Sequence, residues 1–237
     1  MEKIRTQLIN SGFTQDQIEE IKTGFDEGLD ITAYADKEFL AIQMRQIRFG
    51  LESGQHIERV KGYTKLLAEQ LMKDYPEYGL TSDKVSVITS ASALHDIGKI
   101  AIPDAILMKP GKLTQEEFEY MKSHTTKGGE ILNSIKNVWD EEYGKVSYEI
   151  CRHHHERYDG RGYPDGLKGE QIPLSAQIVS IADVYDALVN ERVYKSAFSK
   201  EKAFQMIVTG ECGVFSPKLL DCFWNARRAF ERLADEA

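Results

Sequence analysis

Helical patterning runs through almost the whole of this 237-residue chain. Apolar residues recur at the i, i+3 and i+4 spacing that places them on one face of a helix, whereas the alternation typical of a strand never persists. The segment from His56 to Tyr75 is a long stretch of this kind, and its apolar face comprises Ile57, Val60, Tyr63, Leu66, Leu67 and Leu71. The pattern therefore predicts an all-α fold.

Turn residues and caps divide the rest of the chain into further helices. The residues Thr114 and Glu117 have the spacing of a capping box, and Pro173 stands at a helix start. His95 and Asp96 are expected at the end of one helix, and His124 on the third turn of another. The expected helices cover 84–96, 114 onward, 138–155, 173–188, 201–208 and 217–233.

Residues 1–50 contain an internal repeat with an offset of 26 residues, from Gln17 to Gln43. Each copy has the pattern of a short amphipathic helix that ends at glycine, at Gly28 in the first copy and Gly54 in the second. Two copies are too few for a solenoid. The prediction is a short helical N-terminal extension over 1–50, serving as a cap, docking segment or sensor, followed by one domain over 51–237.

Composition narrows the choice of partners. The net charge of −8 argues against binding a nucleic acid polymer or an anionic membrane by long-range attraction. A phosphate ligand would therefore need local cations. No apolar run is long enough to span a bilayer, and three cysteines without metal-type spacing indicate reduced thiols. We expect a cytoplasmic protein.

The six histidines are placed unevenly. Five lie at or near expected helix ends or on polar helix faces, and His153, His154 and His155 are consecutive. Successive helical residues point about 100° apart, so only two of these three neighbours are expected to face one site. His95 precedes Asp96, and such a pair offers one nitrogen and two oxygens to a metal, although it can also cap a core helix.

The histidines lie on successive expected helices, together with Asp96 and one aspartate later in the chain. Such a set would form a metal site with mixed nitrogen and oxygen ligands. This ligand chemistry favours iron, manganese, nickel or zinc over calcium. No cysteine is placed for a structural zinc site. The sequence therefore predicts a metal centre that contains the His95–Asp96 pair.

Three motifs together resemble the HD-GYP branch of the HD phosphohydrolase superfamily. They are Leu94–Lys99, His154–Pro164 and Ile181–Leu188, and the resemblance runs from about Glu52 to Phe223. It implies an HD-domain helical bundle with two or three divalent metal ions, expected to be iron or manganese. It also implies hydrolysis of the bacterial second messenger cyclic di-GMP to pGpG or GMP.

Carried over position by position, the resemblance implies a ligand set in which Asp96 bridges two ions. Glu52 and His56 would hold a third ion, since residues four apart share a helix face. Glu52 also lies in the second copy of the repeat, at the position that Asp26 holds in the first copy, so the repeat offers another reason for a carboxylate there. Whether two or three metal ions bind is therefore open. The implied metal ligands are Glu52, His56, His95, Asp96, His124, His154, His155 and Asp183.

The resemblance also implies residues that contact substrate. Lys99 would lie beside the phosphate or a bridging hydroxide, and Arg192 and Lys195 would bind the phosphates. The signature loop Gly162–Tyr163–Pro164 would form the rim, where Tyr163 either stacks on guanine or packs the loop. Asp186 is a candidate for assisting proton transfer.

The mechanistic hypothesis is in-line attack of a metal-activated hydroxide on phosphorus. One alternative is an HD phosphohydrolase for cyclic GMP-AMP or a nucleotide. Another is a non-catalytic module that binds a cyclic dinucleotide or docks a diguanylate cyclase through the signature loop. Every matched ligand position is filled, which favours an active enzyme. The sequence leaves open the oligomeric state and the role of His153, for which surface exposure is the simplest interpretation.

Overall fold

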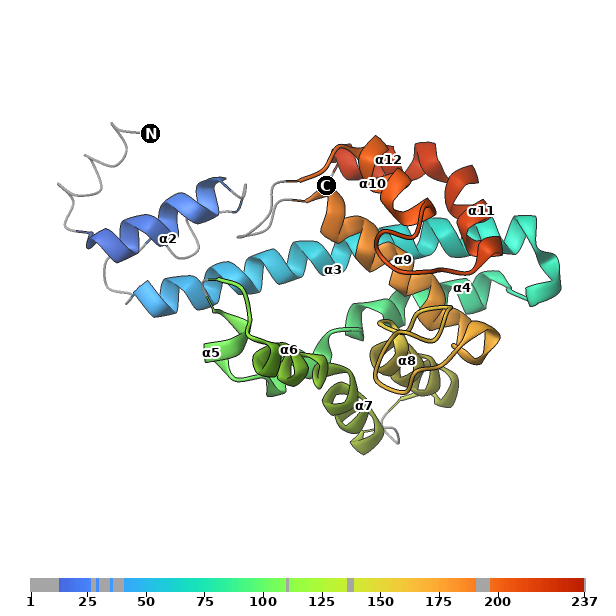
Figure 1. Ribbon diagram of the computed structural model, residues 1–237, viewed down its shortest axis with the longest axis horizontal. Coiled ribbons are helices and arrows are strands. Elements are labelled where there is room, and N and C mark those ends of the chain that lie inside the picture. Colours follow the sequence, from blue (N-terminus) through green and yellow to red (C-terminus); the bar gives the residue numbers. More distant parts are fainter. Residues whose placement is uncertain are drawn as a thin grey trace. The chain divides into compact units, whose positions relative to one another are not determined.

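The computed structural model describes residues 13–26, 29, 35, 41–109, 111–135, 139–190 and 197–236. Across these residues the chain forms helices and connecting loops but no strand, which confirms the all-α prediction (Figure 1). None of the described helices combines the length and apolar composition needed to cross a membrane. The helices are α2 (Gln15–Asp26), α3 (Ala41–Asp74), α4 (Ser82–Ala91), α5 (Asp104–Leu107), α6 (Gln115–Lys122), α7 (His124–Ser134), α8 (Glu141–His153), α9 (Leu174–Val189), α10 (Lys200–Val208), α11 (Pro217–Asn225) and α12 (Arg227–Glu236), with 3-10 turns η2 (Pro76–Tyr78), η3 (Ser92–Leu94), η4 (Ile97–Ala101) and η6 (Gly169–Gln171).

The chain divides into two compact units, Met1–Ile57 and Glu58–Ala237. In the first unit, α2 begins after Thr14, whose hydroxyl oxygen accepts the Gln17 backbone N–H. The expectation that the second repeat copy ends as a short helix at Gly54 is wrong, because α3 continues to Asp74. An interior glycine costs a helix only about 1 kcal/mol, which packing of the later turns offsets. The predicted division at residue 50 stays a prediction.

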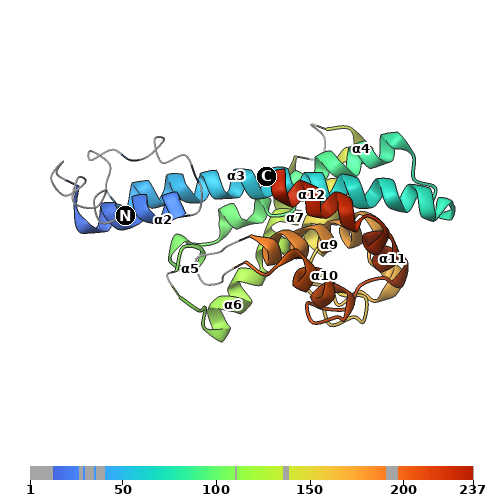
Figure 2. The ribbon, with the colours of Figure 1, turned by 90° about the horizontal axis from the view of Figure 1, so that it is seen from above.

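The core of the second unit forms around α9, which is buried along most of its length. Helices α8 and α10 pack against α9 (Figure 1), and α10 lies beside α9 in Figure 2 as well. The ring of Tyr185 on α9 lies 5.1 Å from that of Tyr63 on α3 and 5.2 Å from that of Phe230 on α12. Burying each large apolar side chain contributes about 1.5–3 kcal/mol. The aromatic cluster thus fixes α9 against α3 and α12.

Several helices end earlier than the sequence pattern predicts. Helix α4 stops at Ala91, α6 stops at Lys122, and the expected C-terminal helix is interrupted at Ala226. At two of these ends a serine hydroxyl donates to a carbonyl three residues earlier, Ser92 to Thr89 and Ser123 to Tyr120, which competes with the helical pattern. As a result His124 is the first residue of α7 rather than part of a third turn.

Candidate metal centre

Close backbone contact at Gly98 brings three segments of the second unit together. A Cβ atom on Gly98 would lie 1.8 Å from the carbonyl oxygen of His124 and 2.5 Å from the nitrogen of Gly128. A Cβ atom on Gly128 would in turn lie 2.4 Å from Sγ of Cys151 on α8. Only glycine permits such approaches. The His95–Asp96 turn is therefore held against the start of α7 and the end of α8.

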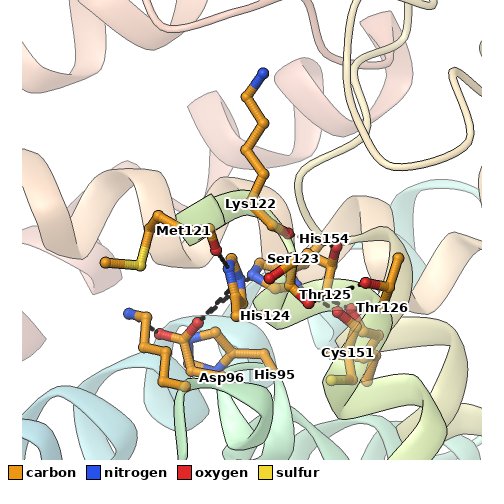
Figure 3. Close-up of polar contacts among 12 residues, drawn as sticks. His95, Asp96, Met121, Lys122, Ser123, His124, Thr125, Thr126, Cys151 and His154 are labelled. Carbon is orange, nitrogen blue, oxygen red and sulfur yellow. Dashed lines mark hydrogen bonds and ion pairs between the residues drawn. The ribbon is translucent and has the colours of Figure 1, made fainter. Parts of the chain in front are cut away.

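Three histidine rings surround the carboxylate of Asp96 (Figure 3). Nε2 of His95 lies 3.3 Å from Oδ2, and Nε2 of His124 lies 3.3 Å from Oδ1. Nε2 of His154 lies 3.9 Å from the same Oδ1 atom. All three rings are buried. The helix ends thus direct three nitrogens and two oxygens at one point.

The other ring nitrogen of each histidine faces a backbone carbonyl. The Nδ1 atoms of His95 and His124 each lie 2.8 Å from the oxygen of the residue three positions earlier, Ser92 and Met121. Nδ1 of His154 lies 3.1 Å from the oxygens of Ile150 and Cys151. A carbonyl only accepts, so Nδ1 carries the proton and the lone pair of a neutral ring is on Nε2.

Buried polar atoms without hydrogen-bond partners mark the same point. Within the described part of the chain they include Oδ1 of Asp96 and the Nε2 atoms of His124 and His154. A neutral Nε2 facing a carboxylate oxygen places two acceptors against each other, an arrangement that is costly when buried. A divalent cation between them would satisfy both, so the residues fit a metal ion.

The pKa values follow from burial and from the central carboxylate. Burial lowers the pKa of His154 to about 3 and also lowers the pKa values of His124 and His155. Burial opposes the positive charge of His95 too, but the carboxylate of Asp96 outweighs it and raises the His95 pKa. Lys99 and His95 hold the pKa of Asp96 well below its usual value despite burial. The lowered pKa values favour neutral rings at His124, His154 and His155, and that of Asp96 favours an ionised carboxylate, and these are the forms that bind metal.

His155 and Asp183 extend the cluster. The ring of His155 lies 4.0 Å from that of His154, and one ligand atom each of His124, His154 and His155 lies within 4.8 Å of the others. The charge of Asp183, on α9, acts to raise the pKa values of His95, His154 and His155. The structure thus gathers six of the eight predicted ligands in the second unit, and their role as ligands stays a prediction.

Lys99 lies directly beside the cluster. Its Nζ atom donates to Oδ2 of Asp96 at 2.5 Å, and its side chain is 40% exposed. One side of the ammonium group therefore faces the half-buried carboxylate of Asp96 while the other reaches solvent. A phosphate oxygen approaching from solvent would meet this positive charge.

The predicted signature loop packs on the histidines. A Cβ atom on Gly162 would lie 2.3 Å from Cα of Glu156, so the loop crosses the end of α8 at backbone contact distance. The ring of Tyr163 stacks on His155 with centroids 4.8 Å apart, and the Tyr163–Pro164 peptide bond is cis. Tyr163 therefore covers one side of the cluster.

Polar residues at and just after the end of α8 hold this loop, and the roles of two of them, Glu156 and His153, were not predicted from the sequence. Glu156 is buried, and its carboxylate accepts the backbone N–H groups of Asp165, Gly166 and Leu167 at 2.7–3.1 Å. Its position next to His154–His155 in the second motif was the available signal. The expectation that His153 is surface-exposed is wrong, because its side chain is 11% exposed and Nε2 lies 3.0 Å from Oδ2 of Asp165.

Asp186 is engaged in a structural contact. Its carboxylate accepts Nε of Arg59 at 2.6 Å and Nδ2 of Asn190 at 2.9 Å, and it is almost fully buried. Arg59 lies on α3 and Asp186 on α9, one turn after Asp183. The pair therefore braces two helices, and the suggested role of Asp186 in proton transfer finds no support in this arrangement.

The remaining predicted residues are not tested by the structure. Arg192 and Lys195 lie outside the described residues, as does the side chain of Glu52. His56 is on α3 within the first unit, three residues before Arg59. Its membership of the cluster stays a prediction.

A cluster of histidines and aspartates at the helix ends of an all-helical domain defines a candidate divalent-metal-binding domain. The chain belongs to the HD domain family, whose sequence profile matches residues 53–217. This match and the relatives below confirm the resemblance drawn from the three motifs.

The proteins similar to the chain include the following two curated proteins and one solved structure. A cyclic di-GMP phosphodiesterase of Vibrio cholerae is 42% identical over 77% of this chain and 38% of its own length. A 3'3'-cGAMP-specific phosphodiesterase of the same organism is 42% identical over 72% of this chain and 30% of its own length. An HDG"Y"P protein from Bdellovibrio bacteriovorus has the same fold, with a TM-score of 0.55, 19% identity, and coverage of 90% of this chain and 69% of that one. The matched part of this chain spans less than half the length of either curated relative.

Proposed function

We propose that the chain is a metal-dependent phosphodiesterase that hydrolyses cyclic di-GMP to pGpG, GMP or both. The observation that carries the proposal is the arrangement of three Nε2 atoms around the half-buried Asp96 carboxylate, with unsatisfied acceptors at the centre. The cyclic di-GMP phosphodiesterase relative supports the choice of substrate.

His95, Asp96, His124, His154, His155 and Asp183 would hold divalent ions. Their mixed nitrogen and oxygen donors suit iron, manganese, nickel or zinc, and we propose iron or manganese because the resemblance to the HD-GYP branch implies these two. Glu52 and His56, one helical turn apart, would add a third ion. Bound ions would lower the pKa of a water molecule and offset charge on the phosphodiester. Asp96 would bridge two ions through its two oxygens.

Other side chains of the chain would bind and orient the substrate. Lys99 would offset the charge of a phosphate oxygen, since its ammonium group already lies against Asp96 at the exposed side of the cluster. Tyr163, stacked on His155, would exclude water from one face of the site. Arg192 and Lys195 would bind the second phosphate, because the acidic remainder of the chain does not attract one.

A second candidate substrate is 3'3'-cyclic GMP-AMP, which the other Vibrio cholerae relative supports at the same identity. Both substrates present the same phosphodiester to the cluster, so they differ only in base recognition. A cytoplasmic location and docking of a diguanylate cyclase on the signature loop remain part of the proposal.

The test is turnover by protein purified without oxygen, with iron or manganese content measured on the same sample. The wild-type chain is expected to hydrolyse cyclic di-GMP, and Asp96→Ala is expected to lose both metal and activity. Asp83→Ala, at an exposed carboxylate in the first turn of α4, is the matched control and should retain both. Absence of turnover of either cyclic dinucleotide by the metal-loaded chain would overturn the proposal.

A further inference from the structure

Helix α6 presents an aromatic side chain to solvent that the core does not need. None of its eight residues is buried, and the Phe118 side chain is 46% exposed. The helix is held by polar contacts instead, a capping box between Thr114 and Glu117 and a 2.5 Å ion pair from Lys109 to Glu117. It lies beside α5 and α7 in both ribbon views (Figures 1 and 2).

A chain of contacts connects Phe118 to the metal centre. Nζ of Lys122 lies 5.1 Å from the centroid of the Phe118 ring and 5.5 Å from that of Tyr163. Tyr163 in turn stacks on His155. Lys122 extends away from Asp96 in Figure 3, so its ammonium group is directed away from the metal ligands. Phe118 and Lys122 therefore lie at the rim of the site, next to the signature loop.

This pair has the chemistry of a purine-binding site. An exposed aromatic ring provides a face on which any of the bases can stack. A lysine ammonium group can donate to O6 and N7 of guanine, whereas adenine presents an amino donor at the equivalent of O6. A stacking ring and an adjacent ammonium group together favour guanine over adenine.

We propose that Phe118 and Lys122 form a guanine subsite. The Lys122 ammonium group, which lies over the Phe118 ring in the free chain, would move to the edge of the base, so that the base stacks on Phe118 and Lys122 donates to O6 and N7. The inference rests on the proposed function, since it assigns one base of the cyclic dinucleotide to α6. It makes α6 the element that distinguishes cyclic dinucleotides with at least one guanine from cyclic di-AMP.

The test measures Kd values of the metal-loaded chain for hydrolysis-resistant phosphorothioate analogues of cyclic di-GMP and cyclic di-AMP. Phe118→Ala is expected to raise Kd about tenfold for both ligands, as expected when one base loses its aromatic partner. Lys122→Gln keeps most of the side chain and is expected to raise Kd about tenfold for the guanine ligand alone. Metal content should be unchanged in both variants.

Helix α11 provides matched controls. Lys218 also lies over two aromatic rings, those of Tyr75 and Tyr78, and pairs with Glu77 at 2.9 Å as Lys122 pairs with Glu119 at 2.8 Å. Trp224 is 50% exposed, close to the exposure of Phe118. Both ribbon views place α11 well away from α6. Lys218→Gln and Trp224→Ala should leave both Kd values unchanged.

The outcomes separate this inference from the proposed function. Unchanged Kd values in Phe118→Ala, an equal effect of Lys122→Gln on both ligands, or loss of metal in either variant would overturn the guanine subsite. Absence of binding to the wild-type chain would overturn it as well. If the wild-type chain binds cyclic di-GMP without hydrolysing it, the proposed function fails, and the expected base-selective losses would still support the subsite.

Discussion

Replacing Gly98 with alanine tests whether close packing assembles the metal centre. The added Cβ would lie 1.8 Å from the His124 carbonyl oxygen, so η4 and α7 must separate by roughly 1.5 Å before the contact is ordinary. Metal–ligand distances tolerate changes of only about 0.2 Å. Overpacking of this kind also destabilises a fold by about 1–3 kcal/mol. Gly98→Ala is therefore expected to lose metal and to lower the free energy of unfolding.

The assay pairs denaturant unfolding with metal analysis of the purified protein. Gly54→Ala is the matched control, because its added Cβ would meet nothing within 4 Å and it lies inside α3. In a helix interior this change should stabilise by about 0.5–1 kcal/mol. Full metal content in Gly98→Ala, or an unfolding free energy equal to that of the wild type, would refute the reasoning.

Two further predictions concern buried carboxylates. Glu156→Gln leaves one oxygen to accept three backbone N–H groups, so we expect a loss of about 1–3 kcal/mol and faster amide hydrogen exchange at 165–167; unchanged exchange would contradict the anchoring role. Asp186→Asn leaves Arg59 buried without its counter-charge and should cost about 3–5 kcal/mol in denaturant unfolding, more than the Arg59→Met, Asp186→Leu double variant. A double variant less stable than Asp186→Asn would contradict this account.

The sequence sufficed for the fold class and for much of the candidate site. The helices could be predicted because the spacing of apolar residues along one helix face is visible within a short stretch of sequence. The gathering of His95, Asp96, His154 and His155 was predicted from residues within the three motifs. His124 lies outside these motifs, and its place in the cluster was predicted from the family resemblance. The resemblance placed Lys99 beside the phosphate or a bridging hydroxide, and its contact with Asp96 was seen only in the structure.

Helix ends were predicted less well because side-chain hydroxyls and tertiary packing decide them. The serines that cap α4 and α6 look like ordinary polar residues in the sequence, yet their hydroxyls donate to carbonyls at the point where each helix stops. At Gly54 the error is in the other direction. A helix was predicted to end at this glycine, but α3 continues through it. Neither result follows from local propensity.

Long-range contacts explain the other differences. Arg59 and Asp186 are 127 residues apart, and no local pattern relates them. The near-contact of Gly98 with Gly128 likewise depends on how η4 packs against α7. Glu156 appeared in a recognised motif, but its role as acceptor for the 165–167 backbone emerges only when the loop folds back.

The most direct test of the metal centre is anomalous X-ray diffraction from crystals of protein purified without oxygen. We predict a metal peak bounded by the Asp96 carboxylate and the Nε2 atoms of His95, His124 and His154. Ligand distances of about 2.0–2.2 Å are expected for nitrogen and oxygen donors. A catalytically active crystal form with its metal bound elsewhere, and with these four side chains uncoordinated, would contradict it.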